Sequence, residues 1–375
     1  MHKKISWTAL VLFAVIVSSA RHSDAGAGAR LADDTIKQLD DFIAKHMQEK
    51  NLPGVVVAVS VPGEGDYTAV KGQANLATGR ARELDDPFRI ASITKTFIGT
   101  AILQLVDQGK LRTSDLLSRW YPEFPNADSM TIDDLLRMRS GIADSADQAL
   151  LQEWYADPLM DLSAAGMIKR AAAKAAQFEP PGRKTVYVNV NFMLLEEILK
   201  KVSGRSTGDQ LSHGIFTPLG MKHTWYPTDN DLPGHLHGYS WDAQTGKFDD
   251  KTVLNPNIPG GAGAIISTVS DLKTYAKALC TGRLLKPDTH KARLATRPLE
   301  GLPEFVGYGE GVAKFGHFCG HNGTIFGFSS EMWYLPEKDA VIVINVNRLD
   351  LDDQSQSTDL FLAITKVLFP AYVQW

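Results

Sequence analysis

The sequence predicts an α/β sandwich in which one antiparallel sheet, built from both ends of the chain, is flanked by helices. Near the N-terminus a helical pattern is followed by two strand patterns, and near the C-terminus strand patterns are followed by a helix. Between them, the apolar residues recur mainly at helical spacing. We therefore expect a discontinuous sheet domain over 30–90 and 300–375, with a mainly helical domain inserted over 91–299.

The N-terminal part of the sheet is expected to begin with a helix that opens at Asp34 and ends before Pro53-Gly54. Its apolar residues fall on one face of the helix: Ile36, Leu39, Ile43 and Met47. A β-branched run over 55–61, a turn rich in glycine and a second run over 67–72 then predict two antiparallel strands.

The helical region contains several bounded helical patterns. Thr131-Ile132-Asp133-Asp134 is a capping-box sequence that predicts a helix ending at Arg139. Further helices are expected over 164–176, 191–202 and 271–279. Strand patterns then return over 307–314, 319–328, 332–335 and 341–347, and a closing helix is expected over 358–368.

Composition and charge limit the classes of function. The chain has 375 residues, 44% of them hydrophobic, which is enough for a large core. Its formal net charge is −4 and no basic patch stands out, which argues against nucleic acid as a partner.

The N-terminal segment is expected to direct export rather than to fold. Residues 1–25 combine a short positive start, a short apolar run and small residues suited to cleavage, which is typical of a signal peptide. The apolar run is too short for a membrane anchor, so we expect no stable anchor after cleavage and a secreted or periplasmic protein. The two cysteines, Cys280 and Cys319, could pair in such a compartment, and the sequence leaves their pairing open.

The central stretch is Ser92 to Lys95, at the start of a helix predicted over 92–108 and ended by Gly109. That helix is apolar on nearly every side, through Phe97, Ile98, Ala101, Ile102, Leu105 and Val106. Ser92 and Lys95 are three residues apart and therefore share a face. A desolvated lysine loses its proton readily, so this spacing predicts a serine nucleophile activated by an amine.

The same S-x-x-K spacing recurs at Ser270 and Lys273. There Thr268 begins an ordinary amphipathic helix as its capping residue, so the second copy is interpreted as structural. The buried surroundings of Ser92 favour the first copy as the functional one.

Two further motifs stand out: Tyr187-x-Asn189 just before a helix, and His321-x-Gly323-Thr324 within a late strand pattern. In isolation each has a structural alternative, such as a half-buried tyrosine or a core histidine. His317, Cys319 and His321 alternate along one strand and suggest zinc, but no fourth ligand is evident and we expect no metal or other cofactor. Trp154-Tyr155 is expected to cover a core.

Together, these three motifs, in this order, resemble the serine β-lactamase and DD-peptidase superfamily. The similarity is greatest to secreted DD-carboxypeptidases, D-aminopeptidases and β-lactamase-like esterases, and it covers nearly all of the chain after residue 25. It implies a β-lactamase/transpeptidase-like fold and no metal or cofactor. The chain has no G-x-S-x-G motif, which argues against an α/β-hydrolase.

The resemblance also implies roles for individual residues. Ser92 would form an acyl-enzyme, and Tyr187 would act as general base, its pKa lowered by the cationic Lys95. Asn189 would hold Lys95 and the substrate amide. The backbone N–H groups of Ser92 and Thr324 would form the oxyanion hole.

Two residues of the late strand would complete this implied site. Gly323 would let the substrate lie close to the strand. His321 would contact the substrate or Tyr187.

The sequence departs from the family pattern in two places. Val188 stands where the middle residue of Tyr-x-Asn is usually serine, and we expect it to face away from the site. Ala313 stands where soluble DD-carboxypeptidases carry an arginine for the substrate carboxylate, and Lys314 should point to the opposite face.

The expected function is therefore an exported serine hydrolase acting on D-amino-acid peptides, including cell-wall peptides, or on small esters. A β-lactamase is the alternative within the fold, although the K-T-G motif is lacking. A non-catalytic penicillin-binding or sensing protein is the alternative from another class.

Overall fold

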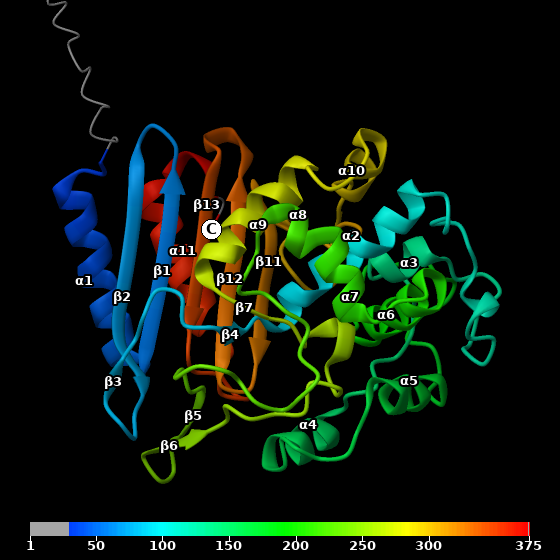
Figure 1. Ribbon diagram of the computed structural model, residues 1–375, viewed down its shortest axis with the longest axis horizontal. Coiled ribbons are helices and arrows are strands. Elements are labelled where there is room, and N and C mark those ends of the chain that lie inside the picture. The colour runs from blue at the N-terminus through cyan, green and yellow to red at the C-terminus, as the bar shows by residue number, and fades with distance from the viewer. Residues whose placement is uncertain (1–29, 374) are drawn as a thin grey trace, which may run out of the picture.

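The computed structural model describes residues 30–373 and 375, and its centre is an antiparallel sheet of nine strands (Figure 1). Their order across the sheet is β3-β2-β1-β13-β12-β11-β10-β9-β8. The strands are β1 (Gly54–Val61), β2 (Gly65–Asn75), β3 (Arg80–Ala81), β8 (Arg297–Pro298), β9 (Val306–Tyr308), β10 (Ala313–Phe315), β11 (Phe318–Ile325), β12 (Phe328–Leu335) and β13 (Ala340–Val346). The N-terminal β1 pairs with the C-terminal β13, Val57 lying opposite Ile344, which confirms a sheet built from both ends.

Two short pairs of strands lie outside this sheet. Strand β4 (Phe88–Arg89) pairs with β7 (Ile266–Ser267), and β5 (Tyr239–Asp242) pairs with β6 (Lys247–Asp250). The first pair ties the segment just before Ser92 to the chain near residue 265.

Helices cover both faces of the central strands, which explains why β1 and β13 are apolar along almost their whole length. The helix α9 (Val269–Thr281) packs on β11, β12 and β13, whereas α11 (Gln356–Leu368) packs on β12 and β13 and contacts α1 (Asp33–Glu49). In Figure 1, α9 lies in front of the sheet and α11 behind it. Although α9 belongs to the stretch expected as the helical domain, it packs on the sheet.

The other helices gather beside the sheet, to the right in Figure 1. They are α2 (Thr94–Asp107), α3 (Ile132–Leu136), α4 (Gln148–Ala156), α5 (Ala164–Ala172), α6 (Val190–Ser203), α7 (Thr207–Leu211), α8 (Thr217–Leu219) and α10 (Pro287–Arg293). The apolar α2 is almost completely buried and packs on α6. The predicted helix that begins near Ser92 is therefore confirmed, and it starts with a short 3₁₀ turn, η1 (Ala91–Ile93).

Several predicted boundaries were wrong. The strand expected over 307–314 is two short strands, β9 and β10, joined by a turn in which Gly311 has φ +65°. The strand expected over 319–328 ends at Ile325, because Gly327, at φ +82°, turns the chain into β12. The capping box at Thr131 is present, but its helix ends at Leu136.

Cys280 on α9 and Cys319 on β11 form a disulfide, which answers the question that the sequence left open. Within residues 30–373 and 375, no helix is both long and apolar enough to cross a bilayer. The expected signal peptide over 1–25 lies outside the described residues.

Candidate active site

Ser92 lies on η1, at the N-terminal end of α2, and Lys95 lies one turn further along. The Lys95 Nζ atom is 2.9 Å from Ser92 Oγ and donates a hydrogen bond of 2.8 Å to the backbone carbonyl of Ala262. Lys95 is completely buried. The predicted pair therefore meets, in the geometry that an i, i+3 spacing gives.

Tyr187 lies just before α6 and closes over this pair. Its ring centroid is 4.9 Å from Lys95 Nζ, and its phenol lies close to the Ser92 hydroxyl. A hydroxyl, an amine and a phenol that are far apart in the sequence thus converge, as the motifs predicted.

Burial sets the protonation of the amine and the phenol. It lowers the pKa of the Lys95 ammonium to about 7, although the nearby Asp144 carboxylate opposes this lowering. Burial raises the pKa of the Tyr187 phenol; the nearby Ser92 hydroxyl opposes this rise, and the Asp144 carboxylate adds to it. The expectation that the pKa of Tyr187 is lowered was therefore wrong, because desolvation of the phenol dominates.

Within residues 30–373 and 375, no hydrogen bond joins Asn189 to Lys95. Its backbone N–H and its side-chain amide both donate to Asp144 Oδ2, each at 3.1 Å. The second oxygen, Asp144 Oδ1, is buried without a hydrogen-bond partner in the described part of the chain. Asp144 carries no recognisable sequence signal and was not among the predicted site residues.

His321 lies behind Tyr187 rather than on the cavity surface. It is 2% exposed, its ring centroid is 6.0 Å from that of Tyr187, and its Nε2 is 3.2 Å from the Tyr308 hydroxyl. Its Nδ1 donates to the backbone carbonyl of Asn322 at 2.5 Å, so Nε2 is the acceptor. Burial lowers the pKa of His321 to about 3, and Lys95 adds to the effect. A contact with Tyr187 is supported, and one with substrate is not.

Gly323 allows a close approach between β11 and the backbone before Ser92, and its expected role toward substrate stays a prediction. A Cβ at this position would lie 2.2 Å from the backbone carbonyl oxygen of Ile90 and 3.2 Å from Ala91 Cβ. Strand β11 therefore packs directly on the turn that carries Ser92. One residue on, Thr324 lines the cavity, and its hydroxyl lies 3.4 Å from Gln354 Oε1.

Ser92 opens into a cavity of about 290 Å³. The lining is mainly apolar, and among the described lining residues none carries a charged side chain. It comprises Ala91, Ser92, Ala146, Leu151, Trp154, Met167, Tyr187, Asn189, Met193, Ile258, Pro259, Ala262, Gly263, Thr324, Ile325, Phe326, Leu349, Leu351 and Gln354. Trp154, expected to cover a core, is thus part of the cavity wall, and its ring contacts Phe326 at 4.6 Å between centroids.

The other residues singled out in the sequence lie outside the Ser92 cavity. Val188 is buried away from the cavity, and Lys314 on β10 lines a separate cavity with Thr296 and Glu304. Ser270 donates its hydroxyl to Asp85 at 2.8 Å on an exposed part of the surface, which agrees with its structural interpretation.

The zinc alternative, which the sequence analysis set aside, has no support here, because each of its three residues has another partner. The Cys319 sulfur is in the disulfide, His317 contacts Glu337, and His321 contacts Tyr308. The described residues contain no cluster suited to a metal.

A serine with a buried amine at the base of an apolar cavity, beside an antiparallel sheet, defines a serine hydrolase. The chain belongs to the Beta-lactamase family, whose model matches residues 39–365. Its curated relatives include the candidate penicillin-binding protein PbpX of Bacillus subtilis, at 29% identity over 70% of this chain, and the protein flp of Staphylococcus aureus, at 25% over 85%. In both cases the match spans 64% of the relative's own length.

Solved structures with the same fold include amide hydrolases. A D-stereospecific amidohydrolase from Streptomyces is 27% identical, with a TM-score of 0.77 over 90% of this chain and 98% of that one. A D-amino acid amidase from Ochrobactrum anthropi, complexed with D-phenylalanine, is 26% identical, with a TM-score of 0.78 over 90% and 99%. A penicillin-binding protein from Bacillus halodurans is 26% identical, with a TM-score of 0.74 over 87% and 100%.

Proposed function

We propose that this chain is an exported serine hydrolase that transfers an acyl group from D-amino-acid amides, D-peptides or small esters to Ser92 and then to water. The observation that carries this proposal is the Ser92–Lys95 pair at an apolar cavity whose described lining is uncharged. The amidase and amidohydrolase among its structural relatives support D-amino-acid substrates.

The protonation of the site supports Lys95 as the group that accepts the Ser92 proton. With a pKa of about 7, the Lys95 amine is largely neutral at slightly alkaline pH, and its Nζ atom lies 2.9 Å from Ser92 Oγ. The Tyr187 phenol keeps its proton, because burial raises its pKa. Tyr187 is then suited to donate that proton to the leaving group and to recover one from Lys95.

The reaction would proceed in two balanced steps. Ser92 Oγ bonds to the carbonyl carbon as its proton passes to Lys95, and the bond to the amine or alcohol breaks as that group takes a proton from Tyr187. In the second step, water bonds to the acyl carbon as its proton passes to Lys95. The bond to Ser92 Oγ breaks as that oxygen takes a proton from Tyr187, and the acid is released. The oxyanion would be held by the backbone N–H groups of Ser92 and Thr324, assisted by the N-terminal end of α2.

The uncharged lining disfavours substrates that carry a free carboxylate near the scissile bond. A carboxylate placed among apolar side chains, without a cationic partner, would lose its hydration without compensation. Lys314, the nearest sequence substitute for the missing arginine, lines a different cavity. Amides and esters are therefore favoured over a peptide ending in D-Ala-D-Ala and over a β-lactam that carries a carboxylate.

Export rests on the signal-peptide pattern over 1–25 and is supported by the Cys280–Cys319 disulfide, since such bonds persist in oxidising compartments. Mass spectrometry of the protein recovered from the periplasm or medium of expressing cells should give a mature N-terminus between residues 20 and 30. A full-length chain found only in the cytoplasm would contradict export.

One panel of substrates tests the proposed activity. We expect turnover of p-nitrophenyl acetate and D-phenylalanine amide, with slower turnover of a D-Ala-D-Ala peptide and of nitrocefin. A fluorophosphonate should label Ser92. Fastest turnover of nitrocefin would instead identify a β-lactamase, and a penicillin adduct without turnover of any substrate would identify a penicillin-binding or sensing protein.

A further inference from the structure

Two walls of the Ser92 cavity come from segments far apart in the sequence. Helix α4 contributes Leu151 and Trp154, and the segment that follows β13 contributes Leu349, Leu351 and Gln354. Neither wall carries one of the reacting groups, and both bound the cavity into which Ser92 opens.

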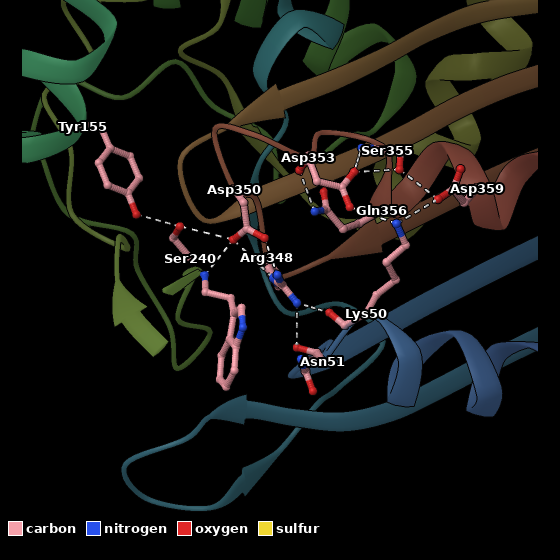
Figure 2. A network of polar contacts seen from close by, with 11 residues as sticks. Lys50, Asn51, Tyr155, Ser240, Arg348, Asp350, Asp353, Ser355, Gln356 and Asp359 are labelled. Atoms are coloured by element: carbon pink, nitrogen blue, oxygen red, sulfur yellow. Dashed lines mark hydrogen bonds and ion pairs between the residues drawn. The ribbon is translucent and has the colours of Figure 1, made fainter. Parts of the chain in front are cut away.

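A chain of hydrogen bonds joins these two walls through β5, as Figure 2 shows. The Tyr155 hydroxyl on α4 donates to Ser240 Oγ at 2.7 Å, and Ser240 Oγ donates to Asp350 Oδ1 at 3.2 Å. The backbone N–H of Trp241 donates to the same Asp350 oxygen at 2.6 Å. Tyr155 directly follows the lining residue Trp154, and Asp350 lies between two lining residues of the other wall.

The far end of this chain is anchored to the N-terminal layer of the fold. The Arg348 guanidinium pairs with Asp350 and donates to the backbone carbonyls of Lys50 and Asn51, just after α1 (Figure 2). The side chains of Arg348 and Asp350 are only 8% and 13% exposed, so water competes little for this pair.

The same segment is held a second time a few residues further on. Lys50 Nζ lies 2.9 Å from Asp353 Oδ2, and Asp353 Oδ1 accepts from the backbone N–H of Ser355 at 3.0 Å (Figure 2). The wall at 349–354 is thus fixed at both ends, whereas Tyr155 is the residue through which α4 joins this polar chain.

We propose that Tyr155, Ser240 and Asp350 are positioning residues that hold the two walls at a fixed separation and thereby limit the size of the acyl group that Ser92 accepts. This inference rests on the proposed function, since it concerns the acyl group of that reaction. None of the three side chains lines the cavity, so they act through Trp154 and the leucines on either side of Asp350.

The Tyr155→Phe variant tests this role with little risk to folding. It removes one hydroxyl, while the ring keeps its edge contact with Phe326 at 5.3 Å and its place under Lys251 Nζ at 4.1 Å. Ser240 Oγ can still donate to Asp350. A matched control is Tyr334→Phe, which removes a comparable 2.8 Å hydrogen bond to Asp339 at the far end of the β12–β13 hairpin.

The measurement is kcat and KM for p-nitrophenyl acetate, butyrate and octanoate. We expect Tyr155→Phe to raise the octanoate-to-acetate ratio of kcat/KM by roughly threefold to tenfold, the effect of one hydrogen bond, with acetate turnover within about twofold of the unmodified enzyme. Ser240→Ala should do the same, and the double variant should add nothing, because both changes break one chain. Tyr334→Phe should leave the ratio unchanged.

Each other outcome overturns the inference. A ratio unchanged in Tyr155→Phe and Ser240→Ala, or an equal loss for all three esters, would show that the hydrogen bonds contribute to stability only. If the variants give either of these results while the unmodified protein turns over acetate through Ser92, the proposed function stands and the inference falls. Absence of any Ser92-dependent turnover would overturn both.

Discussion

Gly323 and Ile90 are in such close contact that an alanine Cβ at position 323 would lie 2.2 Å from the Ile90 carbonyl oxygen. At this contact, β11 packs directly against the turn that carries Ser92. It therefore sets the distance between the nucleophile and Thr324, which is proposed to bind the oxyanion.

We expect Gly323→Ala to lower the free energy of unfolding by about 1–3 kcal/mol, because backbone atoms must move apart to admit the methyl group. Ester turnover should fall by more than the loss of folded protein accounts for, since the same movement separates Ser92 from Thr324. Thermal unfolding and ester turnover would measure the two effects. Gly208→Ala is the control, because its Cβ would be in ordinary van der Waals contact, 3.7 Å from Tyr226 Cβ. Equal tolerance of both substitutions would contradict the argument.

The two S-x-x-K sequences should respond differently to removal of their hydroxyl groups. Ser92→Ala should reduce turnover of every substrate by at least about 10³-fold, because no acyl-enzyme can form. Ser270→Ala should leave turnover nearly intact, since Ser270 is bonded to Asp85 at the surface. Initial rates with purified variants decide this, and similar losses from both would refute the assignment of Ser92.

The residues that sequence could identify are those whose spacing carries information. Ser92 and Lys95 share a helical face, and the apolar run after them predicts burial, so their meeting follows from local geometry. The order of strands at the two chain ends likewise predicts one sheet, because a half-sheet at either end would leave an apolar face exposed.

Other parts of the site depend on tertiary contacts that leave no local pattern. The partner of Lys95 is the backbone carbonyl of Ala262, which any residue could supply. Asp144 and Trp154 reach the site only because the irregular stretch around α4 folds back across it. The pKa of Tyr187 was misjudged for a related reason, since sequence shows a nearby cation but not the burial that outweighs it.

The disulfide should make a measurable contribution to stability. Cys280 and Cys319 are 39 residues apart, and closing a loop of that length restricts the unfolded chain enough to stabilise the fold by about 2–4 kcal/mol. We expect dithiothreitol, or the Cys280→Ala and Cys319→Ala double variant, to lower Tm, with Ser92 labelling retained below the new transition. Two reactive thiols in the unreduced, denatured protein would show that the bond is absent.

The pH dependence of the reaction should report the protonation of Lys95. Below its pKa of about 7 the ammonium cannot accept the Ser92 proton, so kcat/KM should rise with pH through about 7 and then level off. An ordinary lysine would place this rise near pH ~10. His321 cannot be its source, because burial lowers its pKa to about 3. A rise that begins only above pH ~9 would show that Lys95 lacks the lowered pKa on which its role as the base depends.

Two variants assign the rise to Lys95 rather than to another group, since burial also raises the pKa of Glu310 and of Glu331 to about 7. Lys95→Arg should abolish turnover throughout the range, because a guanidinium keeps its proton. Asp144→Asn should move the rise to lower pH, because the Asp144 carboxylate raises the pKa of Lys95 and the amide does not. Rates measured from pH 5 to 10 with p-nitrophenyl acetate would test both variants, and a rise that stays in place in Asp144→Asn would assign it to a group other than Lys95.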